Sequence, residues 1–146
     1  MIFIAEREDL AEIVEMSLSI PKEHGFENLP EVALEKVTGH FLECFKESPI
    51  FVYKVDGKIA GFVATQLVEL WWSKQPVLTD HIFYVHPDYR SLKVLNALIK
   101  AYRDFAKLNG LPIVMNFMSN DRTEVKEKIF ERHGFKKSGF IGTYGI

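Results

Sequence analysis

FYVHPDYRSLKVLNALIKAYRDFAKLNG, residues 83–110, contains the end of a strand, a short stop and a long helix. The apolar run 77–85 is typical of a strand, and the tripeptide His86-Pro87-Asp88 ends it. Over 91–109 one face of the predicted helix is apolar, and Gly110 closes the helix. That face consists of Leu92, Leu95, Leu98, Ile99, Tyr102, Phe105 and Ala106. The stretch therefore predicts a strand that leads directly into an amphipathic helix.

The segments on either side predict further strands and helices in alternation. Asp56-Gly57 separates two β-like runs and is a strong hairpin signal, because glycine tolerates a positive φ. A loop is expected over 20–30, and Pro30 is suited to open a helix because its missing N–H costs nothing there. The expected strands are 2–5, 50–55, 58–70, 77–85 and 112–118, with a last hairpin in 135–146, and the expected helices are 9–17, 30–48, 91–109 and 121–133.

This order of elements points to one compact α/β domain over residues 1–146. Helices fall between strands on both sides of the middle of the chain, which favours a mixed sheet with helices packed on its faces. A length of 146 residues fits a single domain. Periodicity alone does not identify the fold.

Composition excludes several classes of function. A net charge of −2 offers no basic excess for a general nucleic-acid surface. The N-terminus resembles no signal peptide, and no apolar run reaches the length of a membrane helix. The single cysteine, Cys44, excludes an intrachain disulfide and suits a cytoplasmic protein. Cys44 is interpreted as a packing residue, and the five histidines show no convincing metal-ligand spacing, so no metal site is expected.

Three stretches together resemble the GNAT N-acetyltransferase family. They are FVYKVDGKIAGF at 51–62, FYVHPDYR at 83–90 and IFERHGF at 129–135. They occur in the family's order, and the element order matches over essentially the whole chain. The resemblance implies a mixed, mostly antiparallel sheet with helices on both faces, and a V-shaped split between the strands 77–85 and 112–118. It also implies that acetyl-CoA lies in that split.

The resemblance further implies where acetyl-CoA is held. The backbone of the fourth strand pairs with the pantetheine arm, and the helix after it receives the pyrophosphate at its N-terminus. Arg90 matches the first place of the family's loop pattern, whereas Lys93 and Leu95 stand where the family has small residues. Lys93 could pair with phosphate and Ser91 could donate its hydroxyl; alternatively, Ser91 only caps the helix and no CoA binds. The expected contacts are Phe83, Val85, Arg90, Ser91, Leu92, Lys93, Val94, Leu95, Asn120 and Phe130.

Acetyl transfer to an amine needs a group that accepts a proton. The family often uses a glutamate on the fourth strand, where this chain offers Asp80 and His81; the alternative is a surface aspartate and a half-buried histidine without a catalytic role. Phe130 stands where the family often has a tyrosine acid, so Tyr84, Tyr144 or solvent would protonate the leaving thiolate. Asn120 either lies near the cofactor or caps a helix.

The resemblance thus predicts an N-acetyltransferase that uses acetyl-CoA and an amine acceptor: a small molecule, a peptide N-terminus or a lysine. The alternative is a GNAT-shaped binding or structural protein without catalysis, similar to phage-encoded relatives that lack the loop glycines. A third option is a domain that binds another acyl-CoA or phosphate ligand. Trp71-Trp72 is expected before the fourth strand, where it would line the acceptor site or a homodimer interface, or pack in the core.

Overall fold

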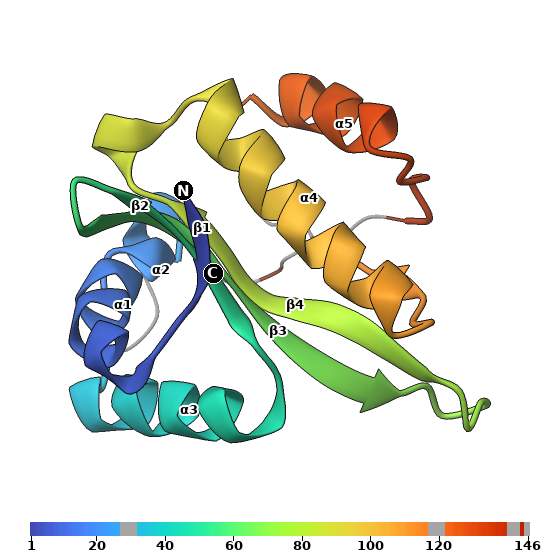
Figure 1. Ribbon diagram of the computed structural model, residues 1–146, viewed down its shortest axis with the longest axis horizontal. Helices are drawn as coiled ribbons and strands as arrows, with labels where there is room; N and C mark the ends of the chain where they lie inside the picture. Colours follow the sequence, from blue (N-terminus) through green and yellow to red (C-terminus); the bar gives the residue numbers. More distant parts are fainter. Residues whose placement is uncertain (27–31, 117–121, 140–143, 145–146) are drawn as a thin grey trace.

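The computed structural model describes residues 1–26, 32–116, 122–139 and 144 (Figure 1). Its strands are β1 Ile2–Ile4, β2 Ile50–Val55, β3 Lys58–Glu69, β4 Pro76–Val85 and β5 Ile113–Val114. Its α-helices are α1 Leu10–Ser17, α2 Ile20–Glu23, α3 Leu34–Glu47, α4 Leu92–Leu108 and α5 Thr123–Arg132, with 3-10 turns at Arg7–Asp9 and Pro87–Tyr89.

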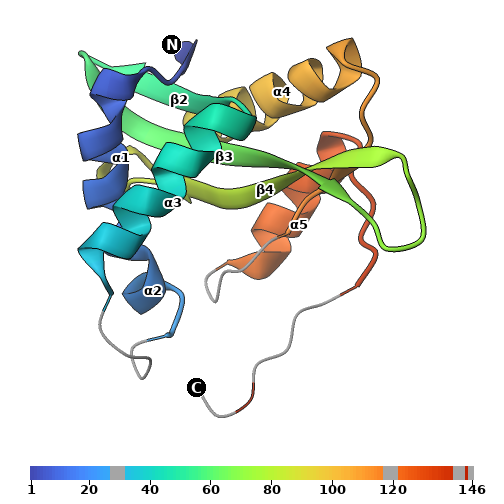
Figure 2. The ribbon, with the colours of Figure 1, turned by 90° about the horizontal axis from the view of Figure 1, so that it is seen from below.

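The strands form one sheet in the order β1-β2-β3-β4-β5. The neighbours from β1 to β4 pair antiparallel, and β5 joins β4 in parallel, so the predicted mixed, mostly antiparallel sheet is confirmed. Helices α1 and α3 lie on one face of this sheet, and α4 and α5 lie on the other (Figure 2). The predicted α/β class with helices on both faces is therefore also confirmed.

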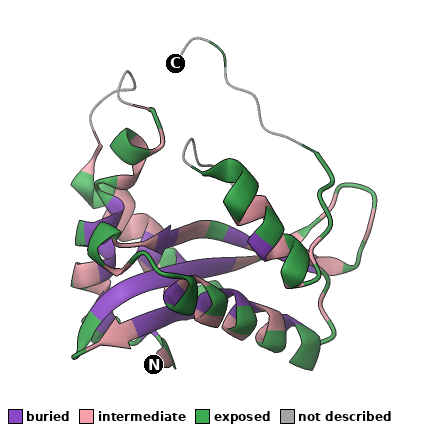
Figure 3. Cartoon of the chain, turned by 90° about the horizontal axis from the view of Figure 1, so that it is seen from above, coloured by how far each residue is buried: buried purple, intermediate pink, exposed green. Residues whose placement is uncertain are grey.

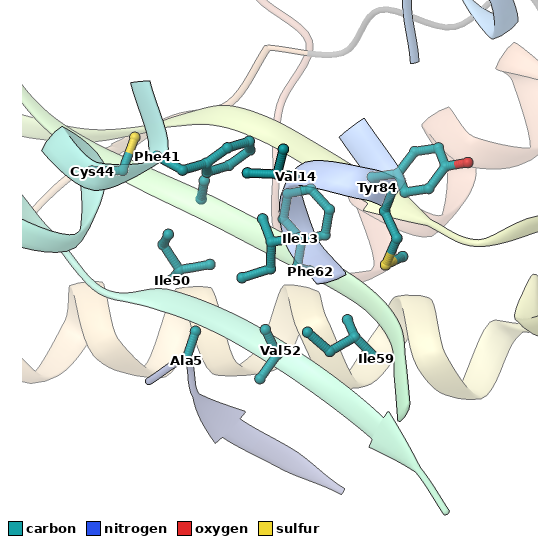
Figure 4. Close-up of a cluster of buried hydrophobic side chains, with 12 residues drawn as sticks. Ala5, Ile13, Val14, Phe41, Cys44, Ile50, Val52, Ile59, Phe62 and Tyr84 are labelled. Carbon is teal, nitrogen blue, oxygen red and sulfur yellow. The ribbon is translucent and has the colours of Figure 1, made fainter. Parts of the chain in front are cut away.

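A hydrophobic core fills the space on each side of the sheet, and the central strands carry most of the buried residues (Figure 3). Because successive side chains of a strand point to opposite faces, β3 serves both cores. Phe62 and Ala64 belong to the core under α1 and α3, shown in Figure 4, whereas Val63 packs against α4. The long apolar face of α4 places Leu98, Tyr102 and its neighbours on the sheet.

The hairpin between β2 and β3 forms at the dipeptide that predicted it. Asp56 and Gly57 both have positive φ angles, 50° and 80°, as a type I′ turn requires. This turn fixes the register of β3 against β2 and thereby the position of β4, which pairs with the other edge of β3.

Several expected segments differ from the structure. The loop predicted over 20–30 contains the short helix α2. Of the strand predicted over 112–118, the described residues 112–116 form a strand at Ile113–Val114, and 117–118 lie outside the described residues. The residues described after α5, namely 133–139 and Tyr144, form no strand, so the predicted last hairpin is not found in them. Trp71 and Trp72 lie in the turn after β3 and are 91% and 65% exposed, which excludes packing of either in the core.

None of the helices in the described part of the chain is long and apolar enough to span a bilayer.

Candidate active site

β4 and β5 part soon after they meet. They pair only at Leu78↔Ile113 and Thr79↔Val114. At the next position the carboxylate of Asp80 accepts a hydrogen bond from the backbone N–H of Asn116, at 2.8 Å, so a side chain extends the contact where the ladder ends. Within the described residues, the second half of β4 has no strand on its β5 side. Among the described residues, the split that the family resemblance implied therefore begins after Asp80.

The backbone of β4 turns polar groups toward this open edge. The N–H of His86 donates to the carbonyl of Ala60 at 2.9 Å, which fixes which β4 residues bond to β3. Because hydrogen-bonded and non-hydrogen-bonded pairs alternate in an antiparallel ladder, Tyr84 bonds to β3, and Phe83 and Val85 direct their N–H and C=O groups away from it. The carbonyl of Val85 accepts from Arg90 Nε at 3.1 Å. Phe83 is thus positioned to pair with an extended ligand.

A β-bulge separates the two candidate bases. Ala64 pairs with Ile82 and Thr65 pairs with Asp80, so His81 is an extra residue in β4. A bulge re-aims side chains. Asp80 lies on the α4 side, where its charge acts on Tyr102, whereas the ring of His81 lies 4.7 Å from that of His40 on α3.

Asp80 is 7% exposed, so the alternative of a surface aspartate is wrong. Burial raises the pKa of its carboxyl to about 6, although the hydrogen bond from Asn116 opposes the rise. His81 is exposed rather than half-buried. Partial desolvation of the His81 ring and the nearby His40 both lower its pKa. With a pKa of about 6, the carboxyl of Asp80 is mostly ionised at neutral pH and can accept a proton there.

The N-terminus of α4 lies next to the open edge of β4. Ser91 is the N-cap, and its Oγ accepts from the N–H of Val94 at 3.4 Å. The hydrogen bonds of the described residues leave the N–H groups of Leu92 and Lys93 without a protein acceptor, and both residues are exposed. Val94 is buried in the core, and Leu95 donates its N–H to the carbonyl of Ser91. The capping expected of Ser91 occurs, and two donors remain for an anion.

Arg90 makes contacts that its loop position did not predict. Its guanidinium pairs with the carboxylate of Glu23 on α2. Glu23 also accepts a 2.6 Å hydrogen bond from the hydroxyl of Tyr84, and Ser19 Oγ lies 3.1 Å from that hydroxyl. Burial would raise the pKa of Glu23, but the hydrogen bonds from Tyr84 and Arg90 lower it overall. Glu23 was missed because the sequence places it in a loop, with no local sign of these partners.

Replacing Tyr84 by phenylalanine removes the 2.6 Å hydrogen bond to Glu23 and leaves the ring in place. Because hydrogen bonds to charged groups contribute more than neutral ones, Tyr84→Phe is expected to lower the free energy of unfolding by about 1–2 kcal/mol. It should also raise the pKa of Glu23. Urea denaturation and an NMR titration of the Glu23 carboxyl measure the two effects. The control is Tyr53→Phe, since the Tyr53 hydroxyl makes no hydrogen bond within the described residues; equal losses in both variants would contradict the prediction.

Phe130 of α5 packs beside the aromatic ring of Phe83 on β4. Its ring lies 6.5 Å from that of Phe83 and 5.7 Å from that of Phe135. Helix α5 is tied to α4 by Arg103, which donates to the carbonyl of His133 at 2.7 Å. Phe130 and Phe83 therefore form one aromatic contact between α5 and β4. Asn120 lies outside the described residues, and Tyr144 is fully exposed.

A cavity of about 310 Å³ opens on the face that carries α1 and α3. It lies beside the bulge, because Ile82 forms part of its wall. Its described lining is Ser17, Ile20, Pro21, Val32, Lys36, Val37, His40, Phe41 and Ile82. The lining is mostly apolar, with one lysine and one histidine.

Several solved structures share the fold over nearly the whole chain. A probable acetyltransferase superposes with a TM-score of 0.75 at 19% identity, covering 100% of this chain and 96% of that one. AAC(6')-Iy in complex with the bisubstrate analogue CoA-S-monomethyl-acetylneamine gives 0.72 at 15%, with 99% and 95% coverage. The aminoglycoside 6'-N-acetyltransferase AAC(6')-IG from Acinetobacter haemolyticus gives 0.69 at 13%, with 100% and 97% coverage. No curated protein matches the chain.

The sequence itself matches a family as well. A family model described as the acetyltransferase (GNAT) domain matches residues 46–137, which include β2, β3, β4, α4, β5 and α5. This match covers more than half of the chain and includes the split and the N-terminus of α4. The chain therefore belongs to the GNAT acetyltransferase family.

Proposed function

We propose that the protein transfers the acetyl group of acetyl-CoA to the nitrogen of an amine acceptor. The observation that carries the proposal is the open edge of β4 beside the N-terminus of α4, in a chain of the GNAT family. Acetyl-CoA has an extended pantetheine arm that carries amides, and a pyrophosphate. Binding both parts requires an open strand edge and a helix N-terminus next to each other. AAC(6')-Iy, which has the same fold, was solved with a CoA bisubstrate analogue.

The residues at the two features suit the two parts of the cofactor. The backbone of Phe83 would pair with the amides of the pantetheine arm, as in strand addition. The N–H groups of Leu92 and Lys93 would bind the pyrophosphate at the positive end of α4. Lys93 is exposed, so its side chain need not block the helix end and can add a positive charge. Arg90 would hold the loop through Glu23 rather than bind phosphate.

Asp80 is proposed as the general base. It lies where β4 and β5 part, and its raised pKa suits a group that accepts a proton near neutral pH. The amine nitrogen forms a bond to the thioester carbon, the C–S bond breaks, and Asp80 takes the amine proton directly or through water. Solvent would protonate the thiolate, since Phe130 has no proton to give and the Tyr84 hydroxyl is bonded to Glu23. His81, on the other face, is the second candidate base.

The cavity beside the bulge lies on the face of the sheet opposite Asp80, so an acceptor bound there would place its amine on the His81 side and would favour His81 as the base. The described lining of the cavity contains no carboxylate, and Lys36 adds a positive charge. A mostly apolar lining suits an amine attached to an apolar group.

A thermal melt with about 1 mM acetyl-CoA tests the first step of this function. If the dissociation constant is about 10 μM, binding should stabilise the fold by roughly 2.7 kcal/mol, which corresponds to about 5–10 °C. Lys93→Ala should reduce the shift because it removes a charge at the N-terminus of α4. Lys107→Ala, a change of the same kind at the other end of α4, should leave the shift unchanged.

A folded protein that shows no shift would instead favour the second function, a GNAT-shaped binding protein without catalysis. The observation that favours it is the loop itself, where Lys93 and Leu95 replace small residues and Phe130 replaces a proton donor. If acetyl-CoA raised the melting temperature of Lys93→Ala and Lys107→Ala equally, the protein would still bind acetyl-CoA, but the placement of the cofactor at the N-terminus of α4 would be contradicted.

A further inference from the structure

Three side chains with metal-binding atoms meet behind the bulge of β4. His40 and Cys44 are four residues apart on α3 and so lie on one face of the helix. His81, the extra residue of the bulge, approaches them from the sheet. One ligand atom from each residue lies within 4.8 Å of the other two. In a regular strand, neighbouring side chains point to opposite faces of the sheet, so only the bulge allows His81 and Ile82 both to face α3.

The distances suit a small tetrahedral ion. Cys44 Sγ lies 3.6 Å from His40 Nε2. With Zn–S of about 2.3 Å and Zn–N of about 2.0–2.1 Å, the sulfur and nitrogen ligands of a tetrahedral zinc ion lie about 3.5 Å apart. Cys44 Sγ and His40 Nε2 therefore already have the spacing of two ligands of one zinc ion, and a ring nitrogen of His81 lies within 4.8 Å of both.

The surroundings allow an ion to enter and be held. Cys44 is 5% exposed, His40 is intermediate and His81 is exposed, so the cluster is closed on the sulfur side and open on the His81 side. Glu47 lies one turn beyond Cys44 on α3, and its negative charge acts on both Cys44 and His81. Two imidazoles, a thiolate and a nearby carboxylate are ligands of the kind that zinc binds.

We propose that His40, Cys44 and His81 bind a divalent transition-metal ion, Zn²⁺ in preference, with water or Glu47 in the fourth position. Binding replaces the proton on Cys44 Sγ, which passes to solvent. The ion would fasten α3 to the bulge of β4. Because His40 also lines the cavity, the ion would form one end of that cavity. This site lies on the α3 side of the sheet, away from Asp80 and from the edge of β4 that would hold acetyl-CoA. A bound ion would occupy the His81 ring and exclude it as a base, but the existence of the site does not depend on the proposed acetyl transfer.

The test is metal binding to the metal-free, folded protein. Titration with Zn²⁺, followed by native mass spectrometry and calorimetry, should give one ion per chain. Titration with Co²⁺ should give a thiolate-to-metal charge-transfer absorption. Because Cys44 is the single cysteine of the chain, this band identifies its sulfur without any mutation. A folded wild-type protein that binds no Zn²⁺, or that binds Co²⁺ without the band, would overturn the proposal.

Variants assign the other ligands. Loss of a residue that hydrogen-bonds to a metal ligand typically lowers metal affinity about 10- to 100-fold, and loss of the ligand itself should lower it at least as much. Cys44→Ser and His81→Asn should therefore each reduce the affinity for Zn²⁺ by that factor or more. The control is His133→Asn, whose ring contacts Asn96 on α4 instead. Circular dichroism of the metal-free variants checks that each is folded. Unchanged affinity in folded Cys44→Ser or His81→Asn would refute the site, as would an equal loss in the control.

Discussion

Replacing Asp80 by asparagine should make the protein more stable at pH 8 and, under the proposed function, nearly inactive. The asparagine amide oxygen can still accept the hydrogen bond from Asn116, so the contact between β4 and β5 is kept. The buried negative charge is lost, and with it the cost of its desolvation. Stability should rise where activity falls, as is common when a functional group is held in an unfavourable environment.

The size of the stability change follows from the pKa. The carboxyl of Asp80 has a pKa of about 6 in the folded protein against 3.8 for the unperturbed group, so between these pH values the folded state binds the proton more tightly. The unfolding free energy contributed by Asp80 therefore falls as the pH rises from about 4 to about 6, and the loss of roughly 2–3 kcal/mol persists above that window. Asp80→Asn should lack this loss.

Two measurements check the prediction. Urea denaturation of the wild type and of Asp80→Asn at several pH values should give curves that diverge between pH 4 and pH 7. A confirmed acetyl-transfer assay should show a loss of about 10²–10⁴ in kcat, and the wild-type rate should rise through about pH 6. Asp88→Asn is the matched control, because its side chain is 81% exposed and should change neither. A fully active Asp80→Asn would transfer the role of base to His81.

Replacing Gly61 by alanine should destabilise the protein by about 2–3 kcal/mol, the upper part of the range for an overfilled core. A Cβ at Gly61 would lie 2.8 Å from the backbone oxygen of Tyr84 and 3.2 Å from Cα of Val85. Both atoms belong to the backbone of β4, so no side-chain rotation relieves the contact. β3 and β4 would have to separate next to the strand end that faces the cleft.

Gly39→Ala provides a control of the same chemical type. A Cβ at Gly39 meets nothing within 4 Å, and the residue lies inside α3. The substitution should therefore stabilise the protein by about 0.5–1 kcal/mol, since alanine has the higher helix propensity. Urea midpoints followed by far-ultraviolet circular dichroism should move in opposite directions for the two variants. A shift of the same sign in both would contradict the close approach of β3 and β4.

Local signals account for the parts of the fold that the sequence predicted. The turn at Asp56-Gly57 depends on two adjacent residues, and the apolar face of α4 repeats over 17 residues. The end of β4 at Val85 is marked by Pro87, two residues later. Each of these signals is contained within one element, so it can be read without knowledge of what the element packs against.

The parts that could not be predicted depend on contacts between distant residues. The bulge at His81 exists only relative to β3, and nothing in the sequence of β4 marks it. Glu23 and Tyr84 are 61 residues apart, and Asp80 and Asn116 are 36 apart. The sequence therefore placed Asp80 and His81 on one strand, but it did not predict that their side chains point to opposite faces of the sheet.

The position of the two tryptophans determines what the intrinsic fluorescence of this protein measures. Trp71 and Trp72 are the two tryptophans of the chain, and both indole rings are already in water in the native state. Their emission maximum should hardly shift when the protein unfolds, so intrinsic tryptophan fluorescence would be a poor measure of unfolding. The same pair, stacked edge to face at 5.1 Å, should instead respond strongly to any molecule that covers the β3–β4 turn. The chain thus has a built-in optical probe of surface contact rather than of stability.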